Sequence, residues 1–201
     1  MKRLSIAFCI AVFASSFLHA QALTQEELKR AADYLEKTRA GVVEATRGLS
    51  EAQWNFKPAP DRWSVAEVTE HIAAAEDLLM GMIHDKVMVA PARTEPEDIK
   101  ALDDLIVTAI PNRSKKLQAP EPLIPTNRFH SPQESLAHFT ESRAKTVSFL
   151  KSTEGLRAHV ADSPLGKKLD GYEWVLFIAA HSDRHTQQIK EVKADPHFPK
   201  S

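Results

Sequence analysis

The sequence predicts an all-α protein, a four-helix bundle with a long crossover between helices 2 and 3. Four capping signals each precede apolar residues spaced three and four positions apart, which is the period of one helix face. No segment shows the alternating pattern of a half-buried strand. Six glycines among 201 residues also argue against a turn-rich β architecture. The chain is therefore expected to bury its core between helices.

The first 22 residues have the features of a signal peptide. Lys2 and Arg3 form a short basic region, residues 4–17 are apolar, and Ala20 and Ala22 give the pattern of a cleavage site. The apolar run is shorter than the ~20 residues of a membrane span, which makes an uncleaved anchor the weaker alternative. We therefore expect export of the mature chain, to the periplasm or the medium, without stable membrane insertion.

The mature chain is long enough for one helical domain, expected over residues 23–196 and followed by a short tail at 197–201. The only cysteine, Cys9, belongs to the predicted leader, so His, Asp and Glu remain for any site chemistry. The formal net charge is −1 and no basic run is longer than Lys115-Lys116. This composition argues against a nucleic-acid partner.

The first helix is expected to begin at a capping box, Thr24 to Glu27, and to end near Gly48. Ser50 then caps a short turn, and residues 58–62 interrupt the chain before the next helix. The predicted buried face of the first helix consists of Leu28, Ala31, Leu35, Thr38, Val42, Ala45 and Leu49.

The second helix begins at another capping box, Ser64 to Glu67, and is expected to run to about Val87. Two roles are open for Glu67. It completes the cap, which is the favoured interpretation, or it orients a metal ligand on the next turn. The predicted buried face consists of Val65, Val68, Ile72, Ala75, Leu79 and Met82.

The segment from Ala90 to His130 has a weak pattern because six prolines fragment it. One short helix is expected within it, between Glu95 and Thr108. A connection of this length in a compact domain often has a function. We expect it to cross the bundle and to shape the rim of a pocket.

The third helix is predicted to start at Ser131, with Pro132 in the first helical position. The fourth is predicted to start at Asp170, with Glu173 as the reciprocal capping residue. One face of the fourth helix contains Trp174, Ile178, His181, His185, Gln188 and Val192. Such a face normally points into a core, so its two histidines need an explanation.

His181 and His185 lie four residues apart, and one helical turn brings their ring nitrogens close enough to bind the same metal ion. The spacing alone is weak, because a chain with nine histidines can contain such a pair by chance. A buried imidazole without a partner costs about 1–3 kcal/mol. A shared metal ion and separately satisfied core histidines would both remove this cost, and both interpretations stay open at this point.

A third ligand is expected from a facing helix, and His71 in the second helix is the candidate. It lies at the edge of the buried face beside Ala74 and Ala75, whose small side chains leave space for an ion or a substrate. Alone, His71 would be an ordinary core histidine. Together with His181 and His185 it completes a three-histidine set with an open coordination position, as in catalytic metal sites.

Other residues have simpler interpretations. Gln188 either bonds a ligand or bound water, or fills the end of the bundle. Asp183 and Arg184 lie off the core face, where solvent exposure or a dimer contact is expected. Core anchoring, rather than a stacking platform, is expected of Trp54, Trp63 and Trp174. Surface or loop positions are expected for His84, His130, His138, His159 and His197.

Two sequence blocks carry a resemblance to a known family. The first is W-S-x-x-E-x-x-x-H, from Trp63 to His71, and the second is H-x-x-R-H-x-x-Q-I, from His181 to Ile189. With these blocks, the chain from about Leu23 to Pro196 resembles the DinB-like, YfiT-like family of metal-dependent helical bundles. The resemblance implies a divalent metal, often zinc or nickel, bound by the three histidines, and it implies a homodimer.

The resemblance also implies thiol-dependent chemistry, namely S-transfer from low-molecular-weight thiols such as bacillithiol or mycothiol, or an isomerase using such a thiol. These thiols are cytosolic reagents, whereas a signal peptide is predicted for this chain. Two hypotheses of function follow. The first is an exported metalloenzyme for transfer or hydrolysis of an unidentified small molecule. The second is a non-catalytic metal-binding or stress-associated bundle.

Overall fold

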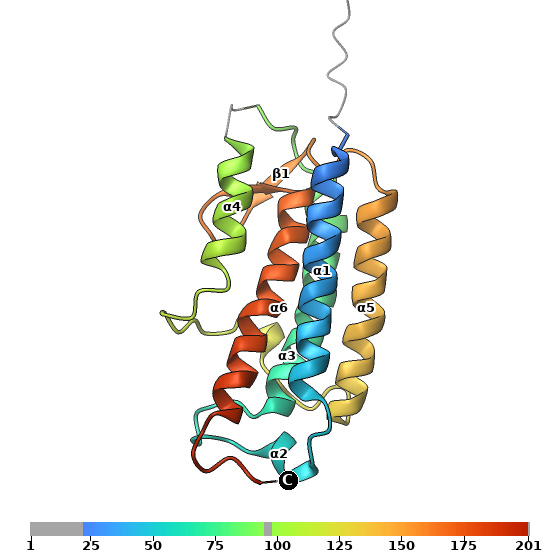
Figure 1. Cartoon of the computed structure of the whole chain (residues 1–201). Helices are drawn as coiled ribbons and strands as arrows, with labels where there is room; N and C mark the ends of the chain where they lie inside the picture. Colours follow the sequence, from blue (N-terminus) through green and yellow to red (C-terminus); the bar gives the residue numbers. More distant parts are fainter. Residues whose placement is uncertain (1–21, 95–97, 201) are drawn as a thin grey trace, which may run out of the picture.

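The computed structural model describes residues 22–94 and 98–200, so the predicted leader, apart from Ala22, lies outside the described residues. Four long helices run side by side and form a bundle (Figure 1). They are α1 (Gln25–Thr46), α3 (Val65–Met82), α5 (Pro132–Ser152) and α6 (Gly171–Lys193). The prediction of an all-α four-helix bundle is confirmed.

Shorter elements fill the connections. α2 (Glu51–Asn55) lies between α1 and α3, and α3 continues into one wider π-helical turn, η1 (Ile83–Val87). The crossover from α3 to α5 contains α4 (Ile99–Ala109) and the 3₁₀ turn η2 (Glu121–Leu123). The predicted short helix of the crossover therefore corresponds to α4.

A small hairpin precedes α6 and was not predicted. Its strands, β1 (Val160–Asp162) and β2 (Lys168–Asp170), pair antiparallel, with Ala161 opposite Leu169. The sequence shows no alternating pattern at these positions. Strands of three residues are too short to produce a recognisable alternation, and the pairing of this hairpin is not encoded in its hydrophobic pattern.

The capping boxes begin the helices at the predicted positions. The side chains of Thr24, Ser64 and Asp170 each accept the backbone N–H three residues later, and the glutamate at that position accepts the cap's own N–H. Ser131 accepts the N–H of Glu134 and has Pro132 at the first helical position. Each cap satisfies N–H groups that the first helical turn leaves without a partner.

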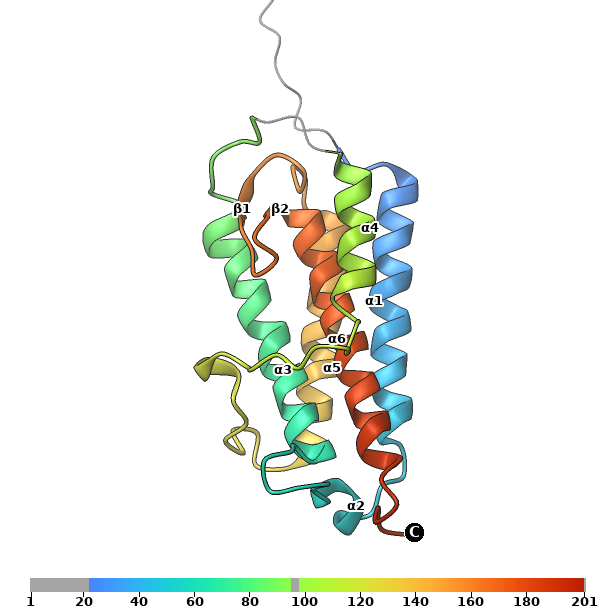
Figure 2. The same ribbon diagram turned by 90° about the vertical axis from the view of Figure 1, so that its left-hand side faces the viewer.

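α6 is the central helix of the structure. It packs against α1 and α3 inside the bundle, while α4 covers its outer side (Figures 1 and 2). α3 and α1 pack against α5 and close the bundle. Residues 171–180 are consequently all buried, although a helix on the surface would bury only one face. None of the described helices is both long and apolar enough to cross a bilayer.

A polar layer divides the apolar core. One apolar cluster contains Leu35, Leu150 and Ile178, and a second contains Val42 and Phe139. On α1, α5 and α6, buried polar residues lie between these clusters along the chain: Thr38, Ser142, Arg143, Thr146, Ser182 and His185. On α3, the buried His71 and Glu76 lie on either side of the point where one cluster gives way to the other. This layer contains two of the histidines that the sequence singled out, His71 and His185, and His181 lies beside them.

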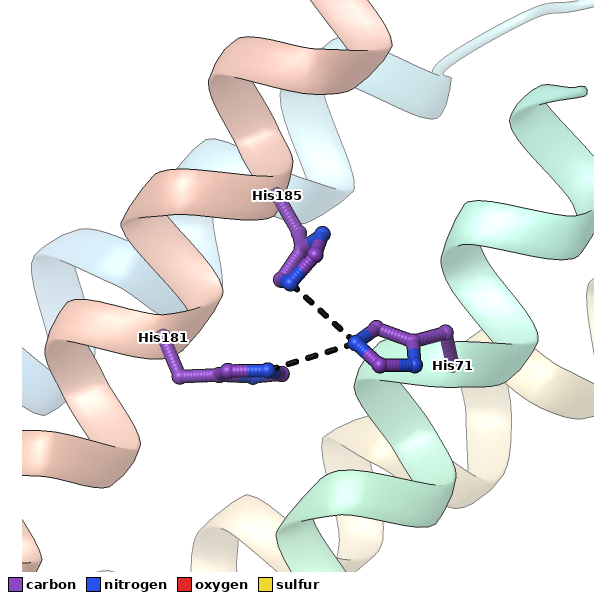
Figure 3. A group of neighbouring side chains, drawn as sticks. All are labelled: His71, His181 and His185. Carbon is purple, nitrogen blue, oxygen red and sulfur yellow. Dashed lines mark hydrogen bonds between the residues drawn. The ribbon is translucent and has the colours of Figure 1, made fainter. Parts of the chain in front are cut away.

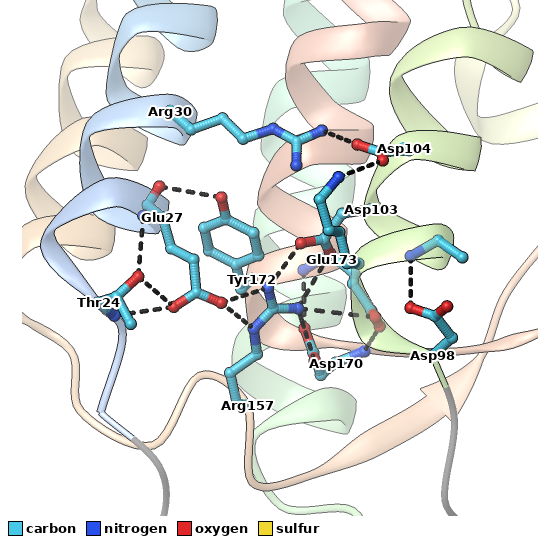
Figure 4. Close-up of polar contacts among 12 residues, drawn as sticks. Thr24, Glu27, Arg30, Asp98, Asp103, Asp104, Arg157, Asp170, Tyr172 and Glu173 are labelled. Atoms are coloured by element: carbon cyan, nitrogen blue, oxygen red, sulfur yellow. Dashed lines mark hydrogen bonds and ion pairs between the residues drawn. The ribbon is translucent and has the colours of Figure 1, made fainter.

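Charged residues form a second buried group at the end of the bundle where α1 and α6 begin (Figure 4). The Arg157 guanidinium lies 2.7 Å from Asp103 of α4, 2.8 Å from Glu27 of α1 and 3.1 Å from Asp170 at the cap of α6. Its guanidinium carbon also lies 4.1 Å from the centre of the Tyr172 ring. Arg157 therefore ties the segment before the hairpin to three helices.

The carboxyl of Glu173 in this group is expected to make stability depend on pH. Burial first, and then the neighbouring charge of Asp170, raise the pKa of Glu173 to about 7 from its usual 4.5. The folded state thus binds this proton more tightly than the unfolded chain. The stabilisation is complete below pH 4.5 and is lost as the pH rises through about 7.

Glu173→Gln should reduce the dependence of the free energy of unfolding on pH in this range. Urea unfolding at a series of pH values measures this dependence. The exposed Glu51→Gln serves as control and should keep the wild-type pH dependence. An unchanged slope in Glu173→Gln between about pH 4.5 and 7 would contradict the assignment.

Candidate metal centre

The structure brings His71, His181 and His185 together (Figure 3). His181 and His185 extend from successive turns of α6, and His71 extends from the facing side of α3. The Nε2 atom of His71 lies 3.2 Å from that of His181 and 3.1 Å from that of His185. Three imidazoles that are distant in sequence therefore point one nitrogen each into the same small volume.

A hydrogen bond at the outer nitrogen of His71, Nδ1, determines which of the two ring nitrogens carries the proton. His71 Nδ1 lies 2.8 Å from the carbonyl oxygen of Leu123 in the crossover. A carbonyl only accepts hydrogen bonds, so Nδ1 carries the hydrogen and donates it. Nε2 of the neutral ring is then unprotonated and directs its lone pair towards the other two histidines.

His185 has the same arrangement on α6. Its Nδ1 lies 2.9 Å from Gln188 Oε1, which is also an acceptor, so Nε2 of His185 carries a lone pair as well. His71 and His185 therefore face each other, Nε2 to Nε2, with no hydrogen between them. A cation bound between the rings would remove this repulsion.

Protonation of the three imidazoles does not supply this positive charge near neutral pH. Burial is the largest cause that lowers the pKa of each of the three imidazoles, and the pKa values of His181 and His185 lie well below the usual value. Protonating one ring would also place its charge beside the other rings of the cluster. The three side chains are neutral imidazoles, the form that binds metal ions.

The separations fit a metal ion. Zinc–nitrogen bonds of 2.0–2.1 Å in tetrahedral geometry place two ligand nitrogens about 3.3 Å apart, close to the two measured separations. The candidate ligand atoms all lie within 4.8 Å of one another, and in the described chain no Asp or Glu joins this group. His181 keeps part of its surface accessible to solvent. The arrangement is that of a three-nitrogen site.

Arg184, between the two α6 histidines, is buried, which corrects the expectation of an exposed or dimer-contact residue. It is 7% exposed, and its guanidinium donates to the carbonyl oxygens of Ile110, Asn112 and Lys115. The sequence pattern gave no sign of this, because the crossover covers a face of α6 that would otherwise be exposed. Arg184 thereby holds the crossover against the helix that carries two of the histidines.

Glu70, the neighbour of His71, holds the other end of the crossover. Its carboxylate accepts the backbone N–H groups of Thr126, Asn127 and Arg128, and the Arg128 side chain as well. These bonds lower the pKa of Glu70, although its burial acts in the opposite direction as the largest cause. The predicted crossing of the bundle is therefore anchored on both histidine-bearing helices.

Glu67 and the three tryptophans have defined places. Glu67 accepts the N–H of Ser64 and pairs with Lys57, so it completes the cap and does not orient His71. Trp54 and Trp174 are buried as expected, whereas the half-buried Trp63 packs on the His71 ring, with the ring centres 4.9 Å apart.

A polar surface depression of about 470 Å³ lies between the beginnings of α3 and α5. It is lined by Lys57, Glu67, Asn127 and residues around them, and none of the three histidines lines it. The histidine group, rather than this depression, is therefore the candidate for the protein's chemistry.

The fold and the site define a class of four-helix bundles with a three-histidine site shared by two helices. Residues 34–189 match the family model of the DinB superfamily, and the chain belongs to this superfamily. The matched region contains all three histidines. The family resemblance drawn from the two sequence blocks is confirmed.

One protein sequence and one solved structure are similar to this chain. The chain is 29% identical to the uncharacterized protein YuaE of Bacillus subtilis (strain 168) over 150 residues, 73% of this chain and 87% of YuaE. A solved structure, YfiT from Bacillus subtilis, is described as a probable metal-dependent hydrolase with an unusual four-helix bundle topology. It superposes with a TM-score of 0.53 at 18% identity, covering 86% of this chain and 89% of YfiT. At this identity the likeness concerns the fold.

Proposed function

We propose that the protein binds one divalent metal ion through His71, His181 and His185 and acts as a metal-dependent hydrolase. The observation that carries the proposal is the 3.1 Å separation of the Nε2 atoms of His71 and His185, two rings whose Nδ1 atoms lie against Leu123 O and Gln188 Oε1. The description of YfiT as a probable metal-dependent hydrolase supports the reaction class. Imidazole ligands suit zinc and nickel, and we propose one of these two metals.

A divalent ion in such a site acts as a Lewis acid that polarises a carbonyl or phosphoryl oxygen and lowers the pKa of a coordinated water towards neutrality. The three imidazoles would hold the ion without neutralising it, because they carry no charge. Leu123 and Gln188 keep the two outer N–H groups bonded, which fixes the orientation of the rings. Trp63 covers one side of His71.

The charges around the site favour an anionic substrate. Arg113 and Arg128 are paired with Glu191 and Glu70, so these charges compensate one another. Arg184 instead donates to backbone carbonyls, and its charge adds to that of the metal ion. A carboxylate- or phosphate-bearing ester would complement this excess of positive charge.

A hydrolysis assay tests the proposal. Zinc-loaded protein, prepared without a histidine tag, is expected to hydrolyse members of a panel of anionic esters. Turnover should disappear with a chelator, return with added zinc, and be absent from His71→Ala. Lack of turnover with zinc, nickel and manganese would count against a hydrolase and favour the non-catalytic metal-binding alternative.

Export, self-association and thiol transfer remain proposals. Residues 1–22 support export to the periplasm or the medium, and the mature amino terminus after cell fractionation would establish it. The family resemblance supports a homodimer, which light scattering would detect. Adding thiol–acceptor pairs to the hydrolysis panel would test thiol transfer.

A further inference from the structure

Arg113 of the crossover lies beside the histidine site and belongs to neither sequence block. Its Nε and Nη2 atoms donate to the carboxylate of Glu191 on α6, at 2.6 and 2.7 Å. The remaining terminal nitrogen, Nη1, lies 3.3 Å from Gln188 Oε1. The same oxygen accepts the Nδ1–H of His185, so Gln188 connects Arg113 to a candidate metal ligand.

The side-chain amide of Gln188 can point either end at His185. With Oε1 towards the ring, the amide accepts from Nδ1 and leaves Nε2 unprotonated. With the NH₂ end towards the ring, the amide donates to Nδ1, and the proton of the neutral ring moves to Nε2. Only the first tautomer lets His185 bind a metal ion through Nε2.

Arg113 decides between these two orientations. A guanidinium has five donors and no acceptor, so it is compatible with Oε1 and repels the NH₂ end of the amide. The two bonds to Glu191 hold the guanidinium in place with Nη1 directed at Gln188. Anchoring of the crossover alone does not require this contact, because Arg184 already binds three carbonyls of the same segment.

We propose that Arg113 is a positioning residue, which selects the metal-binding tautomer of His185 by orienting the Gln188 amide. The role of this tautomer in metal binding rests on the proposed function, whereas the tautomer itself can be measured in the metal-free protein. The two can therefore be tested separately.

The first test measures the His185 tautomer by long-range ¹H–¹⁵N NMR of the metal-free protein, with the signal identified by its loss in His185→Ala. The wild type should show the Nδ1–H form, and Arg113→Leu should shift the population towards Nε2–H. Arg62→Leu is the matched control, because Arg62 also approaches Glu191, at 4.0 Å, with no hydrogen bond to Gln188 among the described residues. An unchanged tautomer in Arg113→Leu would overturn the proposal.

The second test measures zinc affinity by competition with a chromogenic chelator. Arg113→Leu is expected to weaken binding about tenfold, the lower end of the range for partners that orient metal ligands. Gln188→Glu should abolish this sensitivity, because both carboxylate oxygens accept the Nδ1–H whichever way the group turns. Arg113→Leu could instead lower zinc affinity equally in the wild-type and the Gln188→Glu background. That result would indicate that Arg113 is merely structural and would overturn the proposal.

Failure of the proposed function would look different. A wild-type protein that binds no zinc would overturn the metal site, while the NMR measurement would still decide whether Arg113 selects the tautomer. A wild-type protein that binds zinc, with Arg113→Leu unchanged in affinity and tautomer, would overturn only the role of Arg113.

Discussion

His185→Ala is expected to lower the affinity of the protein for zinc by at least about 100-fold. Structural four-ligand zinc sites bind with about 10–16 kcal/mol, so each ligand contributes about 3 kcal/mol. A loss of this size corresponds to about two orders of magnitude in the dissociation constant. The remaining pair, His71 and His181, would hold an ion far less firmly.

A competition titration with a chromogenic chelator measures this loss, and thermal unfolding gives a second readout. Zinc at about 100 times the dissociation constant should stabilise the wild type by about 2.7 kcal/mol, and this stabilisation should vanish in His185→Ala. His138→Ala is the matched control. The His138 side chain is 37% exposed and pairs with Asp77 rather than with the histidine group, so this variant should keep the wild-type affinity. Equal zinc affinity in His185→Ala and wild type would contradict the assignment.

Arg143→Met is expected to destabilise the fold by about 3–5 kcal/mol, the usual cost of breaking a buried ion pair from one side. Two guanidinium nitrogens of Arg143 donate to the Glu76 carboxylate, each at 2.8 Å, and both side chains are 1% exposed. Its terminal nitrogens also donate to the Leu35 carbonyl oxygen and to the hydroxyls of Thr38 and Ser182, so Arg143 joins all four long helices in the polar layer. Methionine would fill the space but leave the Glu76 charge buried.

Urea unfolding measures this effect. Adding Glu76→Gln to Arg143→Met removes the uncompensated charge and should recover part of the loss. Lys145→Met on the same helix is the matched control, because the Lys145–Glu141 pair is exposed and its removal should leave stability nearly unchanged. A similar small change in Arg143→Met and Lys145→Met would show that the polar layer does not hold the helices together.

The helices could be predicted from sequence because their signals are local. A capping residue, its partner three positions later and the apolar period all lie within one or two helical turns, so each helix start follows from a few neighbouring residues. Thr24, Ser64, Ser131 and Asp170 all cap the helices expected of them. The β1–β2 hairpin lacks such a signal, and it was missed.

The three histidines could be predicted from sequence, but not all the groups that bond their outer nitrogens. His181 and His185 share one helix, and the position of His71 on a facing buried stripe made it a candidate. The structure brings the three together. Leu123 could not be found from sequence, because it acts through its backbone carbonyl, which every residue possesses.

The crossing of the bundle was predicted, but the contacts that fix the path of the crossover were not, for a related reason. Its position depends on side chains such as Arg184 and Glu70, which bind backbone groups far away in sequence. Arg184 belongs to a block that carries the family resemblance, yet its burial depends on a segment whose path has no periodic signal. Arg113 was overlooked because neither its spacing nor its neighbours mark it.

The most direct test of the metal centre is anomalous diffraction at the zinc edge from crystals of the untagged protein grown with zinc. We expect one anomalous peak per chain, about 2.0–2.1 Å from the Nε2 atoms of His71, His181 and His185. A peak bound elsewhere, or no peak at this position with zinc, nickel or manganese, would contradict the assignment of these histidines as metal ligands.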